Sequence, residues 1–364
     1  MQKHFGSIFS SPEDAARVPK RLRDSITPET IGRVLSFILL LLCIGISPSC
    51  SPADRTDSDS TADSLTIPTV VKLIGVQWFN RMEVGIQRFS DETGHHTFML
   101  GPPRSDAALQ VQILEDLIAQ NVDAITVVPF SPESLEPVLQ RAMDEGIVVI
   151  THEASNQQSF DLDLEAFDNA AYGAHLMDGL AECMGEEGEY AVFVGSLTSR
   201  THNEWVDAAI ARQKEAYPQM SMVGSKNESY DNQQNAYAKT GELVRTYPKL
   251  KGFLGSASTD VAGVGLAVEE KGLEDRTCVF GTSLPSVSGQ YLNTGAVDRI
   301  SFWDPADAGY AMDILALKVI RGEKVETGDS LGVDGYEDVV VRDSVVYGQA
   351  WVDVTRENMS QYDF

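Results

Sequence analysis

The sequence predicts an α/β protein with two doubly wound parallel-sheet domains, joined by a hinge with a ligand cleft between them. From Val70 onward, short apolar runs alternate with amphipathic stretches, which is the pattern of strand–helix–strand units in parallel sheets. Several such units precede Asp168, and a similar series follows Asn169. The 364 residues are enough for two domains that each bury their own core.

Residues 1–49 are predicted to be a signal peptide with a long leader. A basic stretch at 20–23 precedes an apolar run at 34–46, and small residues follow. The run is shorter than the ~20 apolar residues that span a bilayer. Cys50, which ends this pattern, resembles the lipidated cysteine of a lipobox, although Pro48 stands where a small residue is usual. The alternative is an ordinary signal peptide followed by an incidental cysteine.

Residues 50–66 are predicted to be a disordered tether behind the lipidated Cys50. The stretch 51–64 is rich in Ser, Thr and Asp and has no residue able to build a core. A multiply acylated cysteine would hold the body at a membrane surface. We therefore expect an extracytoplasmic protein, in the periplasm or at the cell surface, that is lipid-anchored to the membrane.

The N-terminal lobe is expected over residues 67–168. Runs of β-branched and apolar residues predict strands at 70–76, 97–100, 124–128 and 148–151. Apolar residues at helical spacing predict helices at 81–93, 107–120 and 132–145. The first strand would then carry Lys72 near its start and two aromatic residues, Trp78 and Phe79, at its carboxyl end.

The C-terminal lobe is expected over residues 169–283. The same patterns predict strands at 190–194, 220–223, 252–254 and 277–280, and helices at 172–184, 204–217, 233–246 and 261–271. Asp168 and Asn169 are expected to hold the interdomain crossover by side-chain hydrogen bonds.

Residues 284–364 are expected to form hinge crossings, a last βα unit at 296–302 and 306–321, and a C-terminal tail. After Gly328, short β-like runs such as 339–341 and 345–347 replace the strand–helix alternation. This change indicates a segment that reaches back across the domain junction. Part of 284–364 would thereby complete the N-terminal lobe.

The chain is strongly acidic. Its formal net charge is −26, from 54 acidic and 28 basic residues, so nucleic acid and anionic lipid are poor partners. We expect a monomer that binds no nucleic acid. Two cysteines, Cys183 and Cys278, lie in the predicted body. A disulfide between them stays open, but the sequence favours two separate buried thiols.

Polar and aromatic residues collect just after the predicted strands. Ligands of open parallel sheets bind beyond the carboxyl ends of the strands, and two facing domains would bring these residues to one cleft. With Lys72 from the first strand, the candidate ligand-binding residues are Trp78, Phe79, Glu153, Thr201, His202, Asn203, Ser256, Ser258, Trp303 and Asp304. Trp205 shares a helix face with Ala208 and Ala209 and is interpreted as core.

The pattern favours binding over catalysis. No phosphate-binding glycine loop and no Gly-x-Ser-x-Gly motif follows a strand. No pair of histidines has helical metal-binding spacing, so we expect no metal and no cofactor. Glu153 and His202 could form an acid–base pair, but both also serve as hydrogen-bonding groups. We therefore expect no enzyme.

A small sugar would explain these residue types. Aromatic rings cover the apolar C–H faces of a sugar ring, and a carboxylate such as Glu153 accepts hydrogen bonds from its hydroxyls. Lys72 would donate to the opposite edge of the ligand. The sequence therefore predicts one small, neutral, polar ligand.

Several short motifs, in their order and spacing, resemble the type I periplasmic binding proteins over residues 70–364. Within that family the chain is most similar to the rhamnose-type and autoinducer-2-type binding proteins of ABC importers. The motifs are residues 72–76 with Phe79, 121–125, 131–134, 203–205, 247–248, 303–304, 328–329 and 357–364.

The resemblance implies ligand contacts at specific residues. Lys72 and Glu153 stand where the autoinducer-2 receptors have a lysine and an aspartate, while Thr201 and His202 replace an aspartate and a glutamine. A proline and an alanine that contact the ligand through their backbone are replaced by Ser256 and Ser258. Because one acid is lost and a histidine gained, a pentose, deoxyhexose or related furanose fits better than autoinducer-2.

The resemblance also implies a role. The protein would capture the sugar and deliver it to ABC permease subunits. The alternative is a receptor that signals through a membrane sensor kinase without transport. A DNA-binding repressor of the same fold is rejected, because a signal sequence stands where its helix-turn-helix would be.

Overall fold

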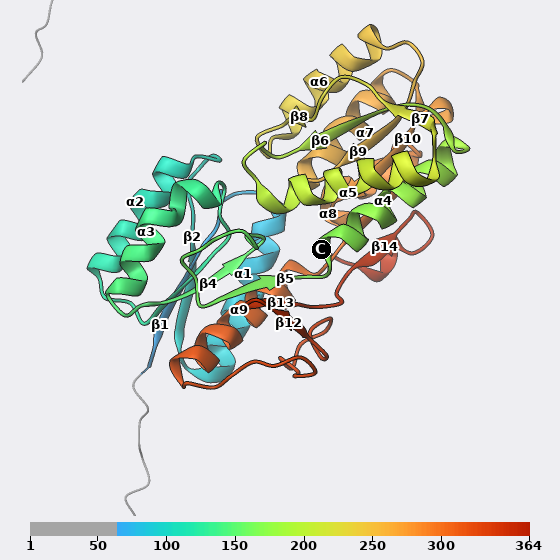
Figure 1. Ribbon diagram of the computed structural model, residues 1–364. Helices are drawn as coiled ribbons and strands as arrows, with labels where there is room; N and C mark the ends of the chain where they lie inside the picture. The colour runs from blue at the N-terminus through green and yellow to red at the C-terminus, as the bar shows by residue number, and fades with distance from the viewer. Residues whose placement is uncertain (1–63) are drawn as a thin grey trace, which may run out of the picture. The chain divides into compact units, whose positions relative to one another are not determined.

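The computed structural model describes residues 64–364, which form two lobes of α/β structure (Figure 1). Each lobe contains a seven-stranded sheet. The predicted signal peptide, the predicted lipidation site Cys50 and most of the predicted tether lie outside the described residues. Within 64–364, no helix combines the length and the apolar character needed to cross a membrane.

The N-terminal lobe is built on a sheet with the order β12-β13-β5-β4-β3-β1-β2, parallel except at its β12 edge. Helices α2 and α3 pack together on one face, and α1 and α9 pack together on the other. The strands are β1 (Thr66–Val70), β2 (His96–Leu100), β3 (Ala124–Val127), β4 (Val148–His152), β5 (Leu162–Glu165), β12 (Val340–Arg342) and β13 (Val345–Tyr347). The helices are α1 (Gln77–Thr93), α2 (Ala107–Ala119), α3 (Pro132–Asp144) and α9 (Pro305–Ile320).

The C-terminal lobe repeats this plan with the order β14-β11-β10-β9-β6-β7, and β8 pairs beside β6. Helices α4 and α5 pack against each other, and α7 packs between α6 and α8. The strands are β6 (Glu187–Val194), β7 (Gln219–Met222), β8 (Asn227–Glu228), β9 (Leu250–Gly255), β10 (Cys278–Thr282), β11 (Arg299–Phe302) and β14 (Val352–Val354). The helices are α4 (Asn169–Met184), α5 (Arg200–Ala216), α6 (Gln233–Thr246), α7 (Ser258–Glu270) and α8 (Pro285–Thr294).

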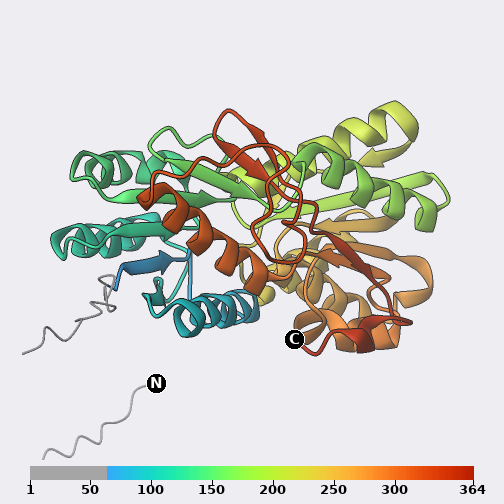
Figure 2. The same cartoon turned by 90° about the horizontal axis from the view of Figure 1, so that it is seen from below.

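The chain crosses between the lobes after β5, after β11 and after β13. The last crossing runs beside the first, because Gly348 N–H donates to Glu165 O and Ala350 N–H donates to Ala166 O. Figure 2 shows the C-terminal segment in red passing over both lobes. It adds β13 in parallel to β5 of one lobe and β14 in antiparallel to β11 of the other. The predicted fold class of two doubly wound α/β domains is confirmed.

The crossover residues behave as side-chain anchors. The Asp168 carboxylate accepts from the N–H groups of Ala170 and Ala171 and so caps α4. Asn169 donates through Nδ2 to Glu204 and accepts from Trp205 Nε1.

The first strand was predicted in the wrong place. β1 ends at Val70, so Lys72 follows the strand, and Trp78 and Phe79 lie in the first turn of α1. Pro68 lies within β1, which is paired on both sides, and a proline argues against such a strand because it lacks an N–H group. The apolar run after it is a loop in which Gly75 has a φ of 84°.

The interpretation of the cysteines as two separate buried thiols was wrong. Cys183 and Cys278 form a disulfide with their Cα atoms 6.0 Å apart. Cys183 is exposed near the end of α4, and Cys278 begins β10. The two are 95 residues apart in sequence, and only the packing of α4 on the sheet at β10 brings them together.

Candidate ligand-binding site

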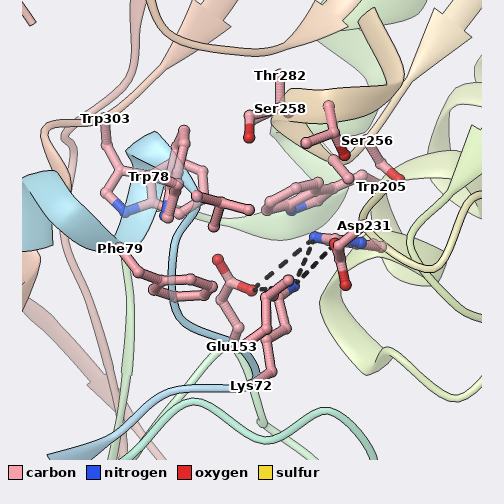
Figure 3. A pocket seen from close by; sticks show the side chains of 15 residues that line it. Lys72, Trp78, Phe79, Glu153, Trp205, Asp231, Ser256, Ser258, Thr282 and Trp303 are labelled. Atoms are coloured by element: carbon pink, nitrogen blue, oxygen red, sulfur yellow. Dashed lines mark hydrogen bonds and ion pairs between the residues drawn. The ribbon is translucent and has the colours of Figure 1, made fainter. Parts of the chain in front are cut away.

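A pocket lies between the lobes, beyond the carboxyl ends of the strands. It encloses about 380 Å³ of empty space, its open mouth included. Lys72 and Glu153 line one side, and Ser258 and Thr282 line the opposite side (Figure 3). The full lining is Lys72, Leu73, Val76, Trp78, Phe79, Glu153, His202, Trp205, Asp231, Ser256, Ala257, Ser258, Thr259, Thr282 and Trp303.

The structure brings most of the candidate residues into this pocket. From the N-terminal lobe these are Lys72, Trp78, Phe79 and Glu153, and Trp303 lies at the second crossing. From the C-terminal lobe they are His202, Ser256 and Ser258. These residues meet because the carboxyl ends of the strands in both parallel sheets face the cleft, as the sequence predicted.

Three candidates do not line the pocket and have structural partners instead. Thr201 is buried and donates to Glu165 Oε1 at 3.3 Å. Asn203 donates to the backbone oxygens of Ser196 and Ser199, at 2.8 and 2.7 Å. Asn203 therefore stabilises the loop and first turn of α5, whereas Thr201 links α5 to the end of β5.

Asp304 is the third such residue. It caps α9 by accepting from Ala306 N–H, and it forms an ion pair with Arg81 of α1. The Arg81 guanidinium also stacks on the ring of Phe364, 3.9 Å from its centroid. The Asp304 side chain therefore joins α1 to α9.

Sequence reasoning missed two large contributors to the lining. Trp205 was interpreted as core; it is 1% exposed, yet its ring forms a pocket wall. Its spacing of three residues from His202 on α5 puts both on one helix face, with ring centroids 5.4 Å apart. Asp231 follows the two-residue strand β8, which no periodicity could reveal. Asp231 thus adds a second carboxylate to the pocket lining, from a position that the sequence did not predict.

The aromatic walls come from three different segments. The ring of Trp303 contacts Trp78 of α1 edge-on, with centroids 4.6 Å apart, and lies 5.6 Å from Trp205 of α5. Trp205 Nε1 donates to Asn169 Oδ1 at 2.7 Å, which fixes the ring. Such walls can cover the C–H faces of a small ligand.

Glu153 reaches the pocket through an unusual backbone conformation. It follows directly after β4 and has a φ of 60°, in the left-handed region that costs energy for residues other than glycine. The side chain is 8% exposed. Strain of this kind persists where the surrounding structure enforces it, and here it turns a carboxylate into the cleft.

Lys72 lies at the centre of a buried polar cluster. Its Nζ is 3.8 Å from Glu153 Oε2, 3.6 Å from Asp231 Oδ1 and 3.4 Å from His202 Nε2. All four side chains are at most 8% exposed. Burial lowers the pKa of Lys72, but the charges of Asp231 and Glu153 outweigh it and raise the pKa above its ordinary value. Lys72 is therefore charged at neutral pH.

The pKa of His202 is shifted in the opposite direction to that of Lys72. Burial, and then the neighbouring Lys72 charge, hold the pKa of His202 well below its ordinary value. Its ring is therefore neutral at neutral pH. Nδ1 accepts from the backbone N–H of Gly195 at 3.2 Å, so the ring proton resides on Nε2. Nε2–H is thus a hydrogen-bond donor inside the pocket.

A family model described as "Periplasmic binding protein domain" matches residues 67–324. The D-ribose/D-allose-binding protein of Pseudomonas aeruginosa is 26% identical over 121 residues, which is 32% of this chain and 36% of the relative. The three curated relatives compared are matched over 36%, 45% and 52% of their own length, so the aligned part spans about half of them or less.

Solved structures share the fold over most of the chain. An ABC transporter solute-binding protein from Clostridium phytofermentas with bound L-rhamnose superposes with a TM-score of 0.76 and 19% identity, covering 82% of this chain and 98% of that one. LsrB from Clostridium saccharobutylicum in complex with AI-2 gives a TM-score of 0.77 and 21% identity, covering 82% and 100%.

Proposed function

The chain belongs to the periplasmic binding protein family, and on this basis we propose that it captures a small neutral sugar outside the cytoplasm and delivers it to an ABC permease. The ligand class we propose is a pentose, a deoxyhexose or a related furanose. The proposal places the protein on the membrane surface through a lipid on Cys50.

The observation that carries this proposal is the composition of the pocket between the lobes. Aromatic rings of Trp78, Trp205 and Trp303 form apolar walls around a buried cluster of Lys72, Glu153, His202 and Asp231. A sugar has this same division into C–H faces and a polar rim. The walls gain contact area with the faces, and the cluster supplies donors and acceptors for the rim.

The charges support a neutral ligand. Two carboxylates, Glu153 and Asp231, face one ammonium, Lys72, in a site with little exposure to water. A ligand carboxylate or phosphate would meet this negative excess where solvent screens it poorly. We therefore propose that sugar acids and sugar phosphates are rejected.

Proteins similar to this chain bind small neutral sugars. They include a D-ribose/D-allose-binding protein and a solute-binding protein with bound L-rhamnose. The pocket of this chain has the rings and hydrogen-bonding groups that ligands of this kind require.

A thermal-shift panel tests the proposal. Purified protein is heated with D-ribose, D-allose, D-arabinose, L-rhamnose or xylitol, and with D-gluconate as the anionic control. A ligand present at about 100 times its dissociation constant stabilises the folded state by about 2.7 kcal/mol, so a bound sugar raises the unfolding temperature clearly. A response to D-gluconate and to none of the neutral compounds would contradict the proposal.

A further inference from the structure

Asp231 reaches the pocket through a strained turn between β8 and α6. Tyr230 and Asp231 both adopt left-handed backbone conformations, with φ of 56° and 51°. The turn is anchored on β6, since Ser229 N–H donates to Val194 O and Tyr230 N–H donates to Gly195 O. Consecutive left-handed residues other than glycine cost energy, so the surrounding structure enforces this placement.

The space beside Gly195 accommodates the side chain of Asp231. A Cβ at this position would lie 2.6 Å from Asp231 Oδ1 and 2.9 Å from His202 Nδ1. Only a glycine therefore lets both groups pack against the end of β6. The absence of a side chain at Gly195 therefore leaves room for a carboxylate and an imidazole side by side.

The carboxylate of Asp231 faces the other lobe with both oxygens. Oδ1 lies 3.6 Å from Lys72 Nζ, and Oδ2 accepts from Ser105 Oγ at 3.2 Å. A direct ammonium–carboxylate hydrogen bond is about 2.7–2.9 Å long, so Oδ1 is not engaged by Lys72 in that way. Glu153 Oε2, at 3.8 Å from the same ammonium, is in the same situation.

The two hydrogen-bond donors of the cluster also have no acceptor within the cluster at a good hydrogen-bond distance. Lys72 Nζ and His202 Nε2–H are both donors, and 3.4 Å separates their nitrogens. The nearest oxygen of Glu153 is 4.0 Å from His202 Nε2. Two donors therefore lie beside two acceptors at distances longer than good hydrogen bonds.

A hydroxyl group satisfies such an arrangement, because its oxygen accepts while its hydrogen donates. One hydroxyl can accept from Lys72 or His202 and donate to Asp231, and a neighbouring hydroxyl can do the same toward Glu153. This inference rests on the proposed capture of a sugar. We propose that Asp231 is a specificity-determining residue that accepts a hydrogen bond from one hydroxyl of a vicinal pair, while Glu153 accepts from the other.

A cycle of protein and ligand changes tests this assignment. Calorimetry is performed with D-ribose, D-arabinose, L-rhamnose and D-fucose, and the tightest of them is compared with its monodeoxy analogues. We expect the wild-type protein to lose affinity for one analogue by ~30-fold or more, because Asp231 is then left without its partner. In Asp231→Asn, discrimination against that analogue falls to about threefold, while discrimination at the other positions stays unchanged.

Ser105→Ala is the matched control. It removes the second partner of Asp231 but replaces no residue that lines the pocket, so it keeps the wild-type discrimination against every analogue. If Asp231→Asn weakens the sugar and all its analogues by one common factor, as Ser105→Ala would do by loosening the closed lobes, the assignment is overturned. If the wild-type protein binds none of the sugars, the proposed function fails instead, which is a separate result.

Discussion

At the scale of single residues, Glu153 carries the first prediction. Its carboxylate is buried, so a sugar hydroxyl that loses it in Glu153→Ala finds no water in exchange. The expected loss is about 2–4 kcal/mol of binding free energy, or about a thirty- to thousandfold weaker dissociation constant by calorimetry. Glu153→Gln keeps the shape and should lose less. Binding of the alanine variant within about threefold of wild type would show that the ligand lies elsewhere.

Gly195 carries the second prediction. In Gly195→Ala the new methyl group overlaps Asp231 Oδ1 and His202 Nδ1, so both side chains must move out of the pocket geometry. We expect sugar binding to weaken by about tenfold or more, comparable to the loss of one charge-assisted hydrogen bond.

Gly241→Ala is the matched control for this change. Its Cβ would come no closer than 3.8 Å to any neighbouring atom, at Lys271 Cε, so binding should be unchanged. Equal affinities for wild type and Gly195→Ala would exclude a role for the Asp231–His202 arrangement.

At the scale of elements, the disulfide joins the end of α4 to the start of β10. It closes a loop between residues 95 apart, and loops of this size restrict the unfolded chain strongly. We expect Cys183→Ser to lower the free energy of unfolding by about 2–4 kcal/mol in denaturant titrations.

Cys278→Ser and the double variant should lose the same amount as Cys183→Ser, because each removes the same bond. A reducing agent should lower wild-type stability to the level of the variants and leave the variants unaffected. A wild-type protein insensitive to reductant would argue against the bond.

Strand β5, which leads into the first crossing between the lobes, makes a pH-dependent contribution to the free energy of unfolding. Asp163 and Glu165 are buried on one face of the strand, and Thr151 donates to Asp163 Oδ1. Burial raises the pKa of Asp163 to about 7, and burial together with the Asp163 charge raises the pKa of Glu165. Protons are thus bound more tightly in the folded state than in the unfolded chain, whose Asp has an ordinary pKa near 3.8.

The sign of the effect follows from this difference. The stability that comes with the protonated form is fully present below about pH 4, and it is lost as the pH rises through about 7. The loss amounts to up to about 4 kcal/mol for a shift of about three pKa units. Asp163→Asn can still accept from Thr151 and should flatten this decline in urea titrations between pH 4 and 8. A wild-type profile with the same slope as the variant would contradict the assignment.

At the scale of the whole molecule, contacts across the cleft predict closure around a ligand. Thr198 Oγ1 of one lobe lies 3.5 Å from Phe130 O of the other, and Lys72 lies 3.6 Å from Asp231. Such contacts can form only when the lobes approach, and hinge closure of this type is a known mode for periplasmic binding proteins. We expect the radius of gyration in small-angle scattering to decrease when a sugar that the protein binds is added to saturation. An unchanged radius would exclude hinge closure.

The sequence determined the two-lobed α/β class and the edge of the sheets at which the pocket lies. The spacing of apolar residues is a local property of the sequence, and it predicts where strands and helices lie. Because parallel strands all end at one edge of a sheet, the residues that follow the predicted strands are candidates for one site. Glu153, His202 and Ser256 were found in this way. Predictions failed where local patterns mislead, as at β1, whose Pro68 and threonines form a paired strand while the apolar run behind them is a loop.

Tertiary structure alone decided which strand-end residues face the cleft. Thr201 and His202 are neighbours on α5, yet one donates to Glu165 and the other lines the pocket, because the direction of a helical side chain depends on how the helix is docked. Asp231 follows a strand too short to have a period, and the disulfide joins residues that only packing brings close. The sequence therefore determined what is local and periodic, and the tertiary structure decided the contacts between distant residues, since these depend on the mutual packing of whole elements.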